Sequence, residues 1–458
     1  MATLLKKWKD TYLAPASFYG KIGRIALPIA GQQILNQGAG FVDTIMVSRV
    51  GGVGAVAVAT QLDMLLGPVS FGINSGVNIY SSQFFGAKDW NSLKKCFGFQ
   101  LLLNLLSALL FFAVAQFAGH SVLRFYASGD ASLIGLGWQY LRIACFGYFF
   151  NALISAFSFM YRSIQQTQIP MMIGIGVNIL NACLNYLLIF GKFGLPQMGI
   201  AGAALATVCG ALAHIVYAVA TQQPFLGSFR EMTAWSGTFI KPIVKRMLPL
   251  IANEAIFGLG NTMYVKAYGL LSPDALSIYK IGNTVGSFFY VAVQGINSAV
   301  GLIVGEQLGR GDLAEAKRCV KYLFPVSAVL AACVALLISL LAEPLVGLFG
   351  LADASIASGA VLMVRLFSVR IAARLFNVIF MSTIRAGGDS VFLMFLDCGI
   401  VWLVGVPLAF LSVYAFHVTS IAAMFAIIQC EQLVRMLIGY RRYKQGKWCR
   451  NLTAETQG

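Results

Sequence analysis

Long apolar segments run through almost the whole chain, and they constrain its fold more than any other feature. A helix needs roughly 20 apolar residues to cross the hydrocarbon core of a bilayer. Only 11% of the 458 residues are charged, against roughly a quarter in soluble proteins. The pattern predicts an all-α polytopic membrane protein with twelve spans near residues 22–48, 54–84, 95–118, 135–160, 168–190, 197–221, 246–270, 275–307, 320–342, 356–383, 390–414 and 417–439.

Basic residues are distributed unevenly between the predicted loops. With the N-terminus inside, 23 of them fall on the cytoplasmic side, including Lys6, Lys7 and Lys9, and three fall on the other side. The positive-inside rule then predicts that both termini are cytoplasmic. The net charge of +16 reflects this orientation, and nucleic-acid binding is not expected. The first span is too long and too polar for a cleaved signal, so we expect a multi-pass protein of the bacterial inner membrane.

The two halves of the chain resemble each other. The segment Phe71–Val77 returns as Gln294–Val300, and Gly86–Asp89 returns as Gly309–Asp312, both 223 residues later. This interval contains six spans, so both halves insert with the same orientation, as parallel repeats. The predicted organisation is an N-terminal six-helix lobe (1–221), a cytoplasmic linker (222–245), a C-terminal six-helix lobe (246–440) and a basic cytoplasmic tail (441–458).

This organisation favours a transporter over other membrane proteins. Two six-helix bundles in one chain suit a central cleft with alternating access, whereas channels more usually assemble identical subunits around a pore. We therefore expect a monomer that acts on a small-molecule substrate within the lipid bilayer.

Polar groups inside a membrane are costly, so they indicate candidate functional sites. One face of the first span carries Gln33, Asn36, Gln37 and Asp43. Asp43 is the acid of this set, and removal from water favours its protonated form, which suits a proton or cation site. The alternative is a partly hydrated acid near the external mouth with a structural role.

Three further residues of the first half could complete a polar shell around this acid. Asn181 and Asn185 lie on one face of the fifth span, and Thr207 on the sixth span is a weaker candidate. Hydrogen bonding between helices is an equally good explanation for the two amides.

The second half carries its own polar set on four predicted spans. Its members are Glu254, Asn261 and Tyr264 on the seventh span, Lys280, Asn283 and Gln294 on the eighth, Arg374 on the tenth and Asp397 on the eleventh. Their charges could form ion pairs that switch during transport, or static pairs that hold the bundle together. Because an unpaired buried acid is costly, we expect Glu254 to lie beside Lys280 or Arg374.

Motifs for catalysis, metals and nucleotides are absent from the sequence. The three histidines, His120, His214 and His417, have no ligand spacing, and there is no phosphate-binding loop. We therefore expect no cofactor or metal and no enzymatic activity. A transporter of this kind would draw its energy from a proton or sodium gradient.

Several motifs together carry a family resemblance. They are Gly40-Phe-Val-Asp-Thr-Ile-Met46, Asn181-Ala-Cys-Leu-Asn-Tyr-Leu-Leu-Ile-Phe-Gly191, Gly199-Ile-Ala-Gly-Ala-Ala-Leu-Ala-Thr207, Arg385-Ala-Gly-Gly-Asp389 and Trp402-Leu-Val-Gly-Val-Pro-Leu408. With them the chain resembles the multidrug and toxic compound extrusion (MATE) family over essentially its whole length. The resemblance implies two six-helix lobes forming a V, and antiport of drugs or organic cations against protons or sodium. It also implies that Asp43, with Asn181 and Asn185 near it, couples the ion.

The second lobe departs from the NorM-type pattern of that family. Phe257 and Arg374 stand where NorM-type members carry acids, so a sodium site of that kind is not expected there. Two other functions are alternatives. A lipid-linked precursor flippase shares the architecture, and a membrane-embedded transferase would need a nucleophile or base that no histidine or acid pair supplies.

Overall fold

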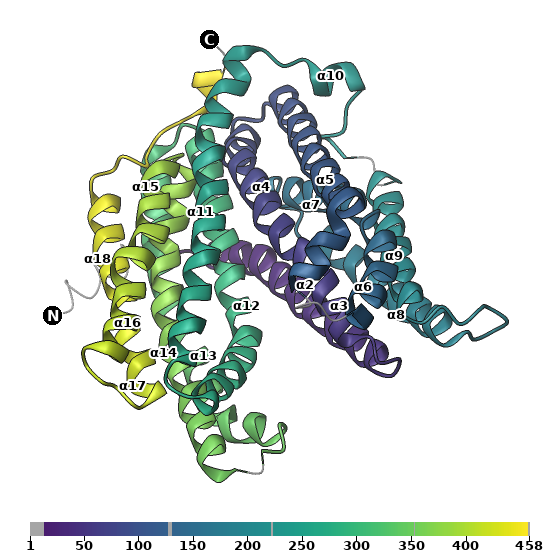
Figure 1. The fold of residues 1–458 in the computed structure, drawn as a ribbon. Helices are drawn as coiled ribbons and strands as arrows, with labels where there is room; N and C mark the ends of the chain where they lie inside the picture. Colours follow the sequence, from purple (N-terminus) through teal and green to yellow (C-terminus); the bar gives the residue numbers. More distant parts are fainter. Residues whose placement is uncertain (1–12, 127–130, 221–222, 352, 457–458) are drawn as a thin grey trace. The chain divides into compact units, whose positions relative to one another are not determined.

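The structure is a computed structural model that describes residues 13–126, 131–220, 223–351 and 353–456. Lys6, Lys7 and Lys9 lie outside the described residues, as do the first position of the expected linker and the last two of the expected tail. Within the described ranges every regular element is helical, and Figure 1 shows the helices gathered into bundles. The predicted all-α class is confirmed.

The helices follow one another with short connections. In chain order they are α2 (Ala16–Ser48), α3 (Val53–Ala59), α4 (Gln61–Ala87), α5 (Trp90–Tyr126), α6 (Ala131–Ala144), α7 (Gly147–Ser163), α8 (Gln168–Phe190), α9 (Ile200–Ala220), α10 (Phe229–Thr233), α11 (Gly237–Gly269), α12 (Pro273–Gly309), α13 (Leu313–Gly347), α14 (Ala354–Ala386), α15 (Ser390–Met394), the π-helices η1 (Phe395–Gly399) and η2 (Val401–Gly405), α16 (Val406–Tyr414), α17 (Ile421–Ile428), α18 (Cys430–Lys444) and the 3₁₀ turn η3 (Thr453–Thr456).

These helices account for the twelve predicted spans. In the part of the chain that is described, eight helical segments are long and apolar enough to cross a membrane, counting α15 to α16 and α17 to α18 as one segment each. Two bent pairs, α3 with α4 and α6 with α7, qualify as broken spans with bends of 40° and 51°. The remaining two predicted spans fall in α2 and α11, each 33 residues long, which carry more polar residues and do not qualify by apolar length alone.

The internal repeat is visible in the turns that end corresponding helices. The N–H of Asp89 bonds to the carbonyl of Phe84 at 3.0 Å, and the N–H of Asp312 bonds to the carbonyl of Gln307 at 3.1 Å. The residue before each aspartate, Lys88 or Gly311, has a positive φ. Both aspartate side chains then accept a bond from the backbone three residues ahead. The matching motifs therefore build the same turn in both halves.

The chain divides into two compact units, and the division differs from the expected lobes. Unit 1 comprises Met1–Ala30 with Lys241–Gly458, and unit 2 comprises Gly31–Ile240. The boundary between Ile240 and Lys241 falls within the expected linker, but the boundary between Ala30 and Gly31 falls inside α2. The reason is that Ile22, Ile25 and Ile29 are buried in the core that α12, α13 and α14 form.

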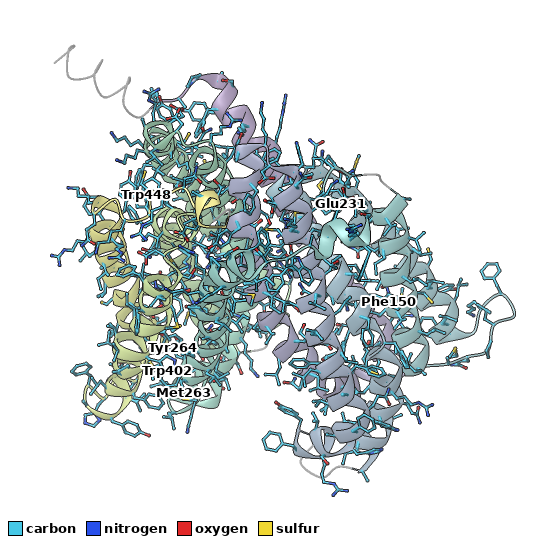
Figure 2. The ribbon with its side chains drawn as sticks, turned by 90° about the horizontal axis from the view of Figure 1, so that it is seen from above. Phe150, Glu231, Met263, Tyr264, Trp402 and Trp448 are labelled. Atoms are coloured by element: carbon cyan, nitrogen blue, oxygen red, sulfur yellow. The ribbon has the colours of Figure 1, made fainter. Side chains whose placement is uncertain are left out.

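The expected linker is shorter and better packed than the sequence indicates. The hydroxyl of Ser236 accepts a bond from the N–H of Phe239, so α11 begins at Gly237 and not near residue 246. Ser228 and Glu231, the second of which is labelled in Figure 2, form a capping box that starts the short helix α10. The indole N–H of Trp235 donates to the carbonyl of Lys95 at 3.0 Å, which holds this segment against α5 within unit 2.

The expected tail is also folded. α18 continues to Lys444, and Trp448, labelled in Figure 2, is only 1% exposed. A Cβ atom on Gly387 would lie 1.9 Å from the carbonyl oxygen of Trp448, so this glycine permits the close approach. Leu452 is fully buried, and Arg246 forms a 2.9 Å ion pair with Glu455. Residues 445–456 therefore pack on unit 1 and are not a free basic extension.

Candidate functional site

Unit 2 holds Asp43 in a chain of amides. Its carboxylate Oδ1 accepts a hydrogen bond from Nδ2 of Asn185 at 2.6 Å, and the same Nδ2 donates to Oδ1 of Asn181 at 3.1 Å. Asn181 and Asn185 share a face of α8 because they lie four residues apart, and they are 9% and 1% exposed. The structure therefore brings together three of the four predicted ion-coupling residues by direct contact.

A cavity of about 450 Å³ opens beside this amide chain. Asp43, Asn185 and Thr207 line it together with Tyr140 and Thr60, so Thr207 reaches the same space without bonding to the acid. Its hydroxyl instead donates to the carbonyl of Ala203. The buried Oδ1 of Asn185 has no hydrogen-bond partner among the described residues. The cavity thus offers one acid, and one of its lining residues, Asn185, keeps a buried amide oxygen unused.

The other polar residues of the first span lie apart from this cavity. Gln33, Asn36 and Gln37 are not among its lining residues, and Asn36 is exposed. The face that the sequence predicts is therefore polar along its length, but only its final part reaches the cavity.

A second acid of unit 2 has its own surroundings. Asp63 lines a separate cavity of about 340 Å³ with Tyr148, Asn151 and Ser155. The two acids therefore occupy different cavities, and Asp63 provides a natural control for Asp43.

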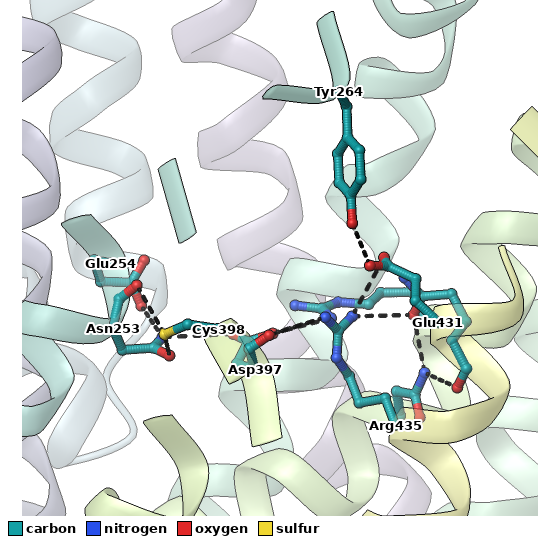
Figure 3. Close-up of polar contacts among 10 residues, drawn as sticks. Asn253, Glu254, Tyr264, Asp397, Cys398, Glu431 and Arg435 are labelled. Atoms are coloured by element: carbon teal, nitrogen blue, oxygen red, sulfur yellow. Dashed lines mark hydrogen bonds and ion pairs between the residues drawn. The ribbon is translucent and has the colours of Figure 1, made fainter. Parts of the chain in front are cut away.

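Unit 1 centres its polar network on Asp397, which lies in the π-helix η1. π-helical turns are rare and are often found at functional sites. Oδ1 of Asp397 lies 3.6 Å from Nη1 of Arg374 and 3.5 Å from Nη2 of Arg435. Nδ2 of Asn253 approaches Oδ2 at 3.5 Å and the thiol of Cys398 donates to Asn253, and Figure 3 shows Asp397 between these residues and Arg435.

Glu431 forms the second acidic centre of unit 1. It accepts a 2.5 Å bond from the hydroxyl of Tyr264 and a 2.8 Å bond from the amide of Gln432 (Figure 3). Arg435, one turn further along α18, lies 3.9 Å away. Gly405 makes room for this contact, since a Cβ there would lie 1.8 Å from the Tyr264 hydroxyl. The network therefore depends on close packing as well as on charge.

A cavity of about 260 Å³ lies against this network. Arg370, Arg374, Arg435 and Glu431 line it with Asn261, Asn283, Tyr290 and the rings of Phe257 and Phe367. Arg370 has no carboxylate within 4.0 Å among the described residues, and its nearest partners are the rings of Phe367 and Phe425. Even with Asp397 beside them, three guanidinium groups face two acids, so the cavity walls carry excess positive charge.

The expected pairing of Glu254 is wrong. Arg374 pairs with Asp397 instead, Lys280 is exposed, and within the described ranges no basic nitrogen lies within 4.0 Å of Glu254. Asn253, adjacent in sequence, donates to its carboxylate at 3.4 Å. The reason is that Asp397 engages Arg374, so Glu254 is left with a neutral amide as its partner. Neither Lys280 nor Gln294 lines the cavity of unit 1.

Several residues of these sites were not predicted from the sequence, Tyr140, Glu431 and Arg435 among them. Tyr140 lies on a predicted span beside Gln139 and Arg142, but these residues form no helical polar stripe that would indicate a site. Glu431 and Arg435 could have been found, because they are charged residues four apart inside an otherwise apolar span. In the described residues no cluster of three or more His, Cys, Asp and Glu side chains could hold a metal ion.

Comparisons with known proteins agree with this architecture. The MatE family model matches residues 28–187 and 249–411. The transporter YisQ of Bacillus subtilis is 27% identical over 98% of this chain and 97% of its own length. A probable multidrug resistance protein NorM of Thermotoga maritima is 22% identical over 93% of this chain and 92% of its own.

A solved structure has the same fold. It is a MOP superfamily transporter of Pyrococcus furiosus, described as having a binding pocket of reversed polarity that suggests a different function. It superposes with a TM-score of 0.83, at 16% identity, over 93% of this chain and 95% of its own.

Proposed function

Because the chain belongs to the MATE family of transporters, we propose that it is a secondary active antiporter that exports small organic molecules, drugs among them, in exchange for protons or sodium ions. The observation that carries this proposal is the Asp43 site. A coupling residue must exchange its ion with water and must respond to its neighbours, and the position of Asp43 on a cavity wall with a bond from Asn185 supports this role.

The amide chain supports the coupling role in a specific way. The ionised carboxylate of Asp43 is held by the N–H of Asn185. When a proton or cation arrives, the unused Oδ1 of Asn185 is an additional acceptor close to the acid. Asn181 and Asn185 therefore support two charge states of Asp43 without introducing a counter-charge. Transport is coupled only if the substrate and the ion favour opposite conformations.

The charge of the cavity in unit 1 bears on the class of substrate. The family resemblance alone suggested organic cations. The arginine-lined walls instead favour a molecule that carries a carboxylate, sulfonate or phosphate group, with Arg370 as its ion partner. The reversed pocket polarity described for the Pyrococcus furiosus transporter is consistent with a family member whose substrate charge differs.

The remaining parts of the proposal concern location and assembly. We place the protein in the bacterial inner membrane with both termini cytoplasmic, as the loop charges favour. We place the whole transport path in a monomer, because one chain carries both repeats. The flippase alternative gains no support from the relatives, whose printed names include multidrug resistance proteins.

The decisive experiment uses purified protein in sealed proteoliposomes, with a proton gradient and a sodium gradient imposed separately. We expect one of the two gradients to drive movement of a carboxylate-bearing dye and to be dissipated in return. If neither gradient drives transport, or if transport needs ATP, the antiporter proposal is wrong. A reporter fused after Gly458 tests the orientation, and a periplasmic signal would contradict it.

A further inference from the structure

A cavity outside both sites lies at the predicted cytoplasmic end of unit 1. It measures about 440 Å³ and is formed by the first turns of α11, the turn between α14 and α15, and the folded tail. We call it the tail pocket. Its lining includes Lys241, Lys245, Arg246, Ser390, Arg450 and Glu455.

The tail pocket carries more positive charge than its own acids balance. Its two acids are engaged: Asp389 pairs with Arg442 at 2.7 Å, and Glu455 pairs with Arg246 at 2.9 Å. Lys241 and Lys245 are exposed and form no ion pair with any acid in the described part of the chain. The pocket can therefore accept an anion from outside the protein.

A buried hydroxyl in the tail pocket points to the same chemistry. Ser390 is 2% exposed, and its Oγ has no hydrogen-bond partner among the described residues. A buried polar group without a partner is costly, and its hydroxyl can donate to an oxygen of a bound group. Four basic side chains and one free hydroxyl around a single cavity are suited to a phosphate.

Apolar side chains continue from the pocket along both helices that form it. On α11, Leu248 lies one turn beyond Lys245 and is 57% exposed. On α15 and η1, Val391 and Phe395 lie one turn apart and are 49% and 64% exposed. A free phosphate has no apolar part that could contact this surface, whereas the acyl chains of a lipid would cover it.

We propose that the tail pocket binds the phosphate group of an anionic phospholipid, with the lipid's acyl chains lying along Leu248, Val391 and Phe395. Lys241 and Lys245 attract the headgroup, and Ser390 donates to a phosphate oxygen. Trp448 and Leu452 anchor the tail so that Glu455 occupies Arg246 when the lipid is absent. The carboxylate of Glu455 is thus an internal competitor of the lipid phosphate.

The test is native mass spectrometry of the full-length protein with added phosphatidylglycerol, phosphatidylcholine or inorganic phosphate. We expect the double variant K241Q/K245Q to bind phosphatidylglycerol about 25-fold more weakly, at about fivefold for each cation removed. The matched control is K317Q/K321Q on α13, which removes two exposed lysines with the same four-residue spacing. It should leave the affinity within about twofold of wild type, since general attraction to the surface changes little.

Two further arms make the outcome decisive. Glu455→Gln should strengthen phosphatidylglycerol binding several-fold, because the competing carboxylate is lost and Arg246 becomes available. Inorganic phosphate should not displace the lipid, because it cannot use the apolar surface. Equal losses in the two lysine variants, equal binding of phosphatidylcholine, or weaker binding by the Glu455 variant would each overturn the proposal. Tight binding of phosphate itself would identify a soluble anion as the occupant.

Discussion

Asp43 in unit 2 and Asp397 in unit 1 both lie within membrane-spanning helices, yet their neighbours differ in kind. The polar groups around Asp43 are amides and hydroxyls, and within the described residues no cation lies within 4.0 Å. Asp397 has Arg374 and Arg435 within 3.6 Å, and Arg435 is 1% exposed. One acid stands beside neutral dipoles, and the other belongs to a nearly balanced ionic network.

The difference teaches what each acid can do. Neutral partners permit a change of charge, because they lose little when the carboxylate takes up a proton. Guanidinium partners oppose it, because protonation would leave two buried cations facing each other. Asp43 is therefore suited to coupling, and Asp397 to holding the helices of unit 1 in one arrangement.

The largest expected effect is on the stability of unit 1. Asp397→Ala leaves the guanidinium groups of Arg374 and Arg435 without their shared carboxylate, and we expect a loss of about 3–5 kcal/mol in the free energy of unfolding. The measurement is denaturant unfolding of the purified protein in detergent. Adding Arg374→Gln to this variant should restore part of the loss. A change below about 1 kcal/mol for the single variant would show that the network is dispensable.

The second prediction concerns transport. Asp43→Asn keeps the shape of the side chain but removes its charge change, so gradient-driven efflux should fall about 100-fold or more. Stability should change by less than about 1 kcal/mol, because no cation is left unpaired. Efflux from proteoliposomes is the measurement, and Asp63→Asn is the matched control in the neighbouring cavity, expected to retain most of the activity. Normal efflux by the Asp43 variant would move attention to Asp397 and Glu254.

The third prediction separates packing from charge in unit 1. A methyl group on Gly405 would meet the Tyr264 hydroxyl at 1.8 Å and Oε2 of Glu431 at 2.5 Å. We expect Gly405→Ala to cost about 1–3 kcal/mol of stability through overpacking. Gly399→Ala, in the adjacent π-helix, is the control because a Cβ there has nothing within 4 Å. Equal thermal stability of the two variants would argue against a tightly packed network.

The fourth prediction concerns the unpaired cation of unit 1. Arg370→Gln should weaken binding of carboxyfluorescein about tenfold, since one charge-assisted hydrogen bond is lost. Binding of the cation rhodamine 6G should not weaken. The control is Arg365→Gln, which removes an arginine that pairs with Glu343 on the exposed surface. Fluorescence polarisation with purified protein gives both affinities, and equal weakening of the two dyes would remove the charge argument.

The sequence predicts most of the fold because the signals that carry it are local. The length of the apolar segments predicts the spans, and the turn motif that recurs before Asp89 and Asp312 predicts the repeat. The division inside α2 could not be predicted, since Ile22 and Ile29 look like any other apolar residues of a span. Their burial depends on which helices pack against them, and that is a tertiary property.

The same distinction between local sequence signals and tertiary packing applies to the candidate sites. Asp43, Asn181 and Asn185 could be grouped because the family motifs and helical spacing place them, and the structure joins them. The sequence does not show which acid pairs with Arg374, since Glu254 and Asp397 are both carboxylates within predicted spans. The π-helical turns of η1 and η2 place Asp397 beside Arg374, and no residue pattern in the sequence predicts these turns.

The prediction with the smallest expected effect concerns Glu231 in the expected linker, and it extends the comparison of the two acids to a solvent-exposed carboxylate. The pKa of Glu231 is lowered, first by the bond from the Ser228 backbone N–H and then by Lys94. Because its folded pKa lies below the usual 4.5, the charge stabilises α10 at neutral pH, and this is lost as pH falls through the folded pKa. Hydrogen exchange of the linker should be a few-fold faster in Glu231→Gln than in wild type at pH 7, and equal in both well below pH 4. A difference that persists in acid would mean that the charge of Glu231 is not what holds the cap. Glu231, held by a backbone N–H and a lysine, keeps its charge at neutral pH, whereas Asp43, the acid that we propose for coupling, is held by a neutral amide.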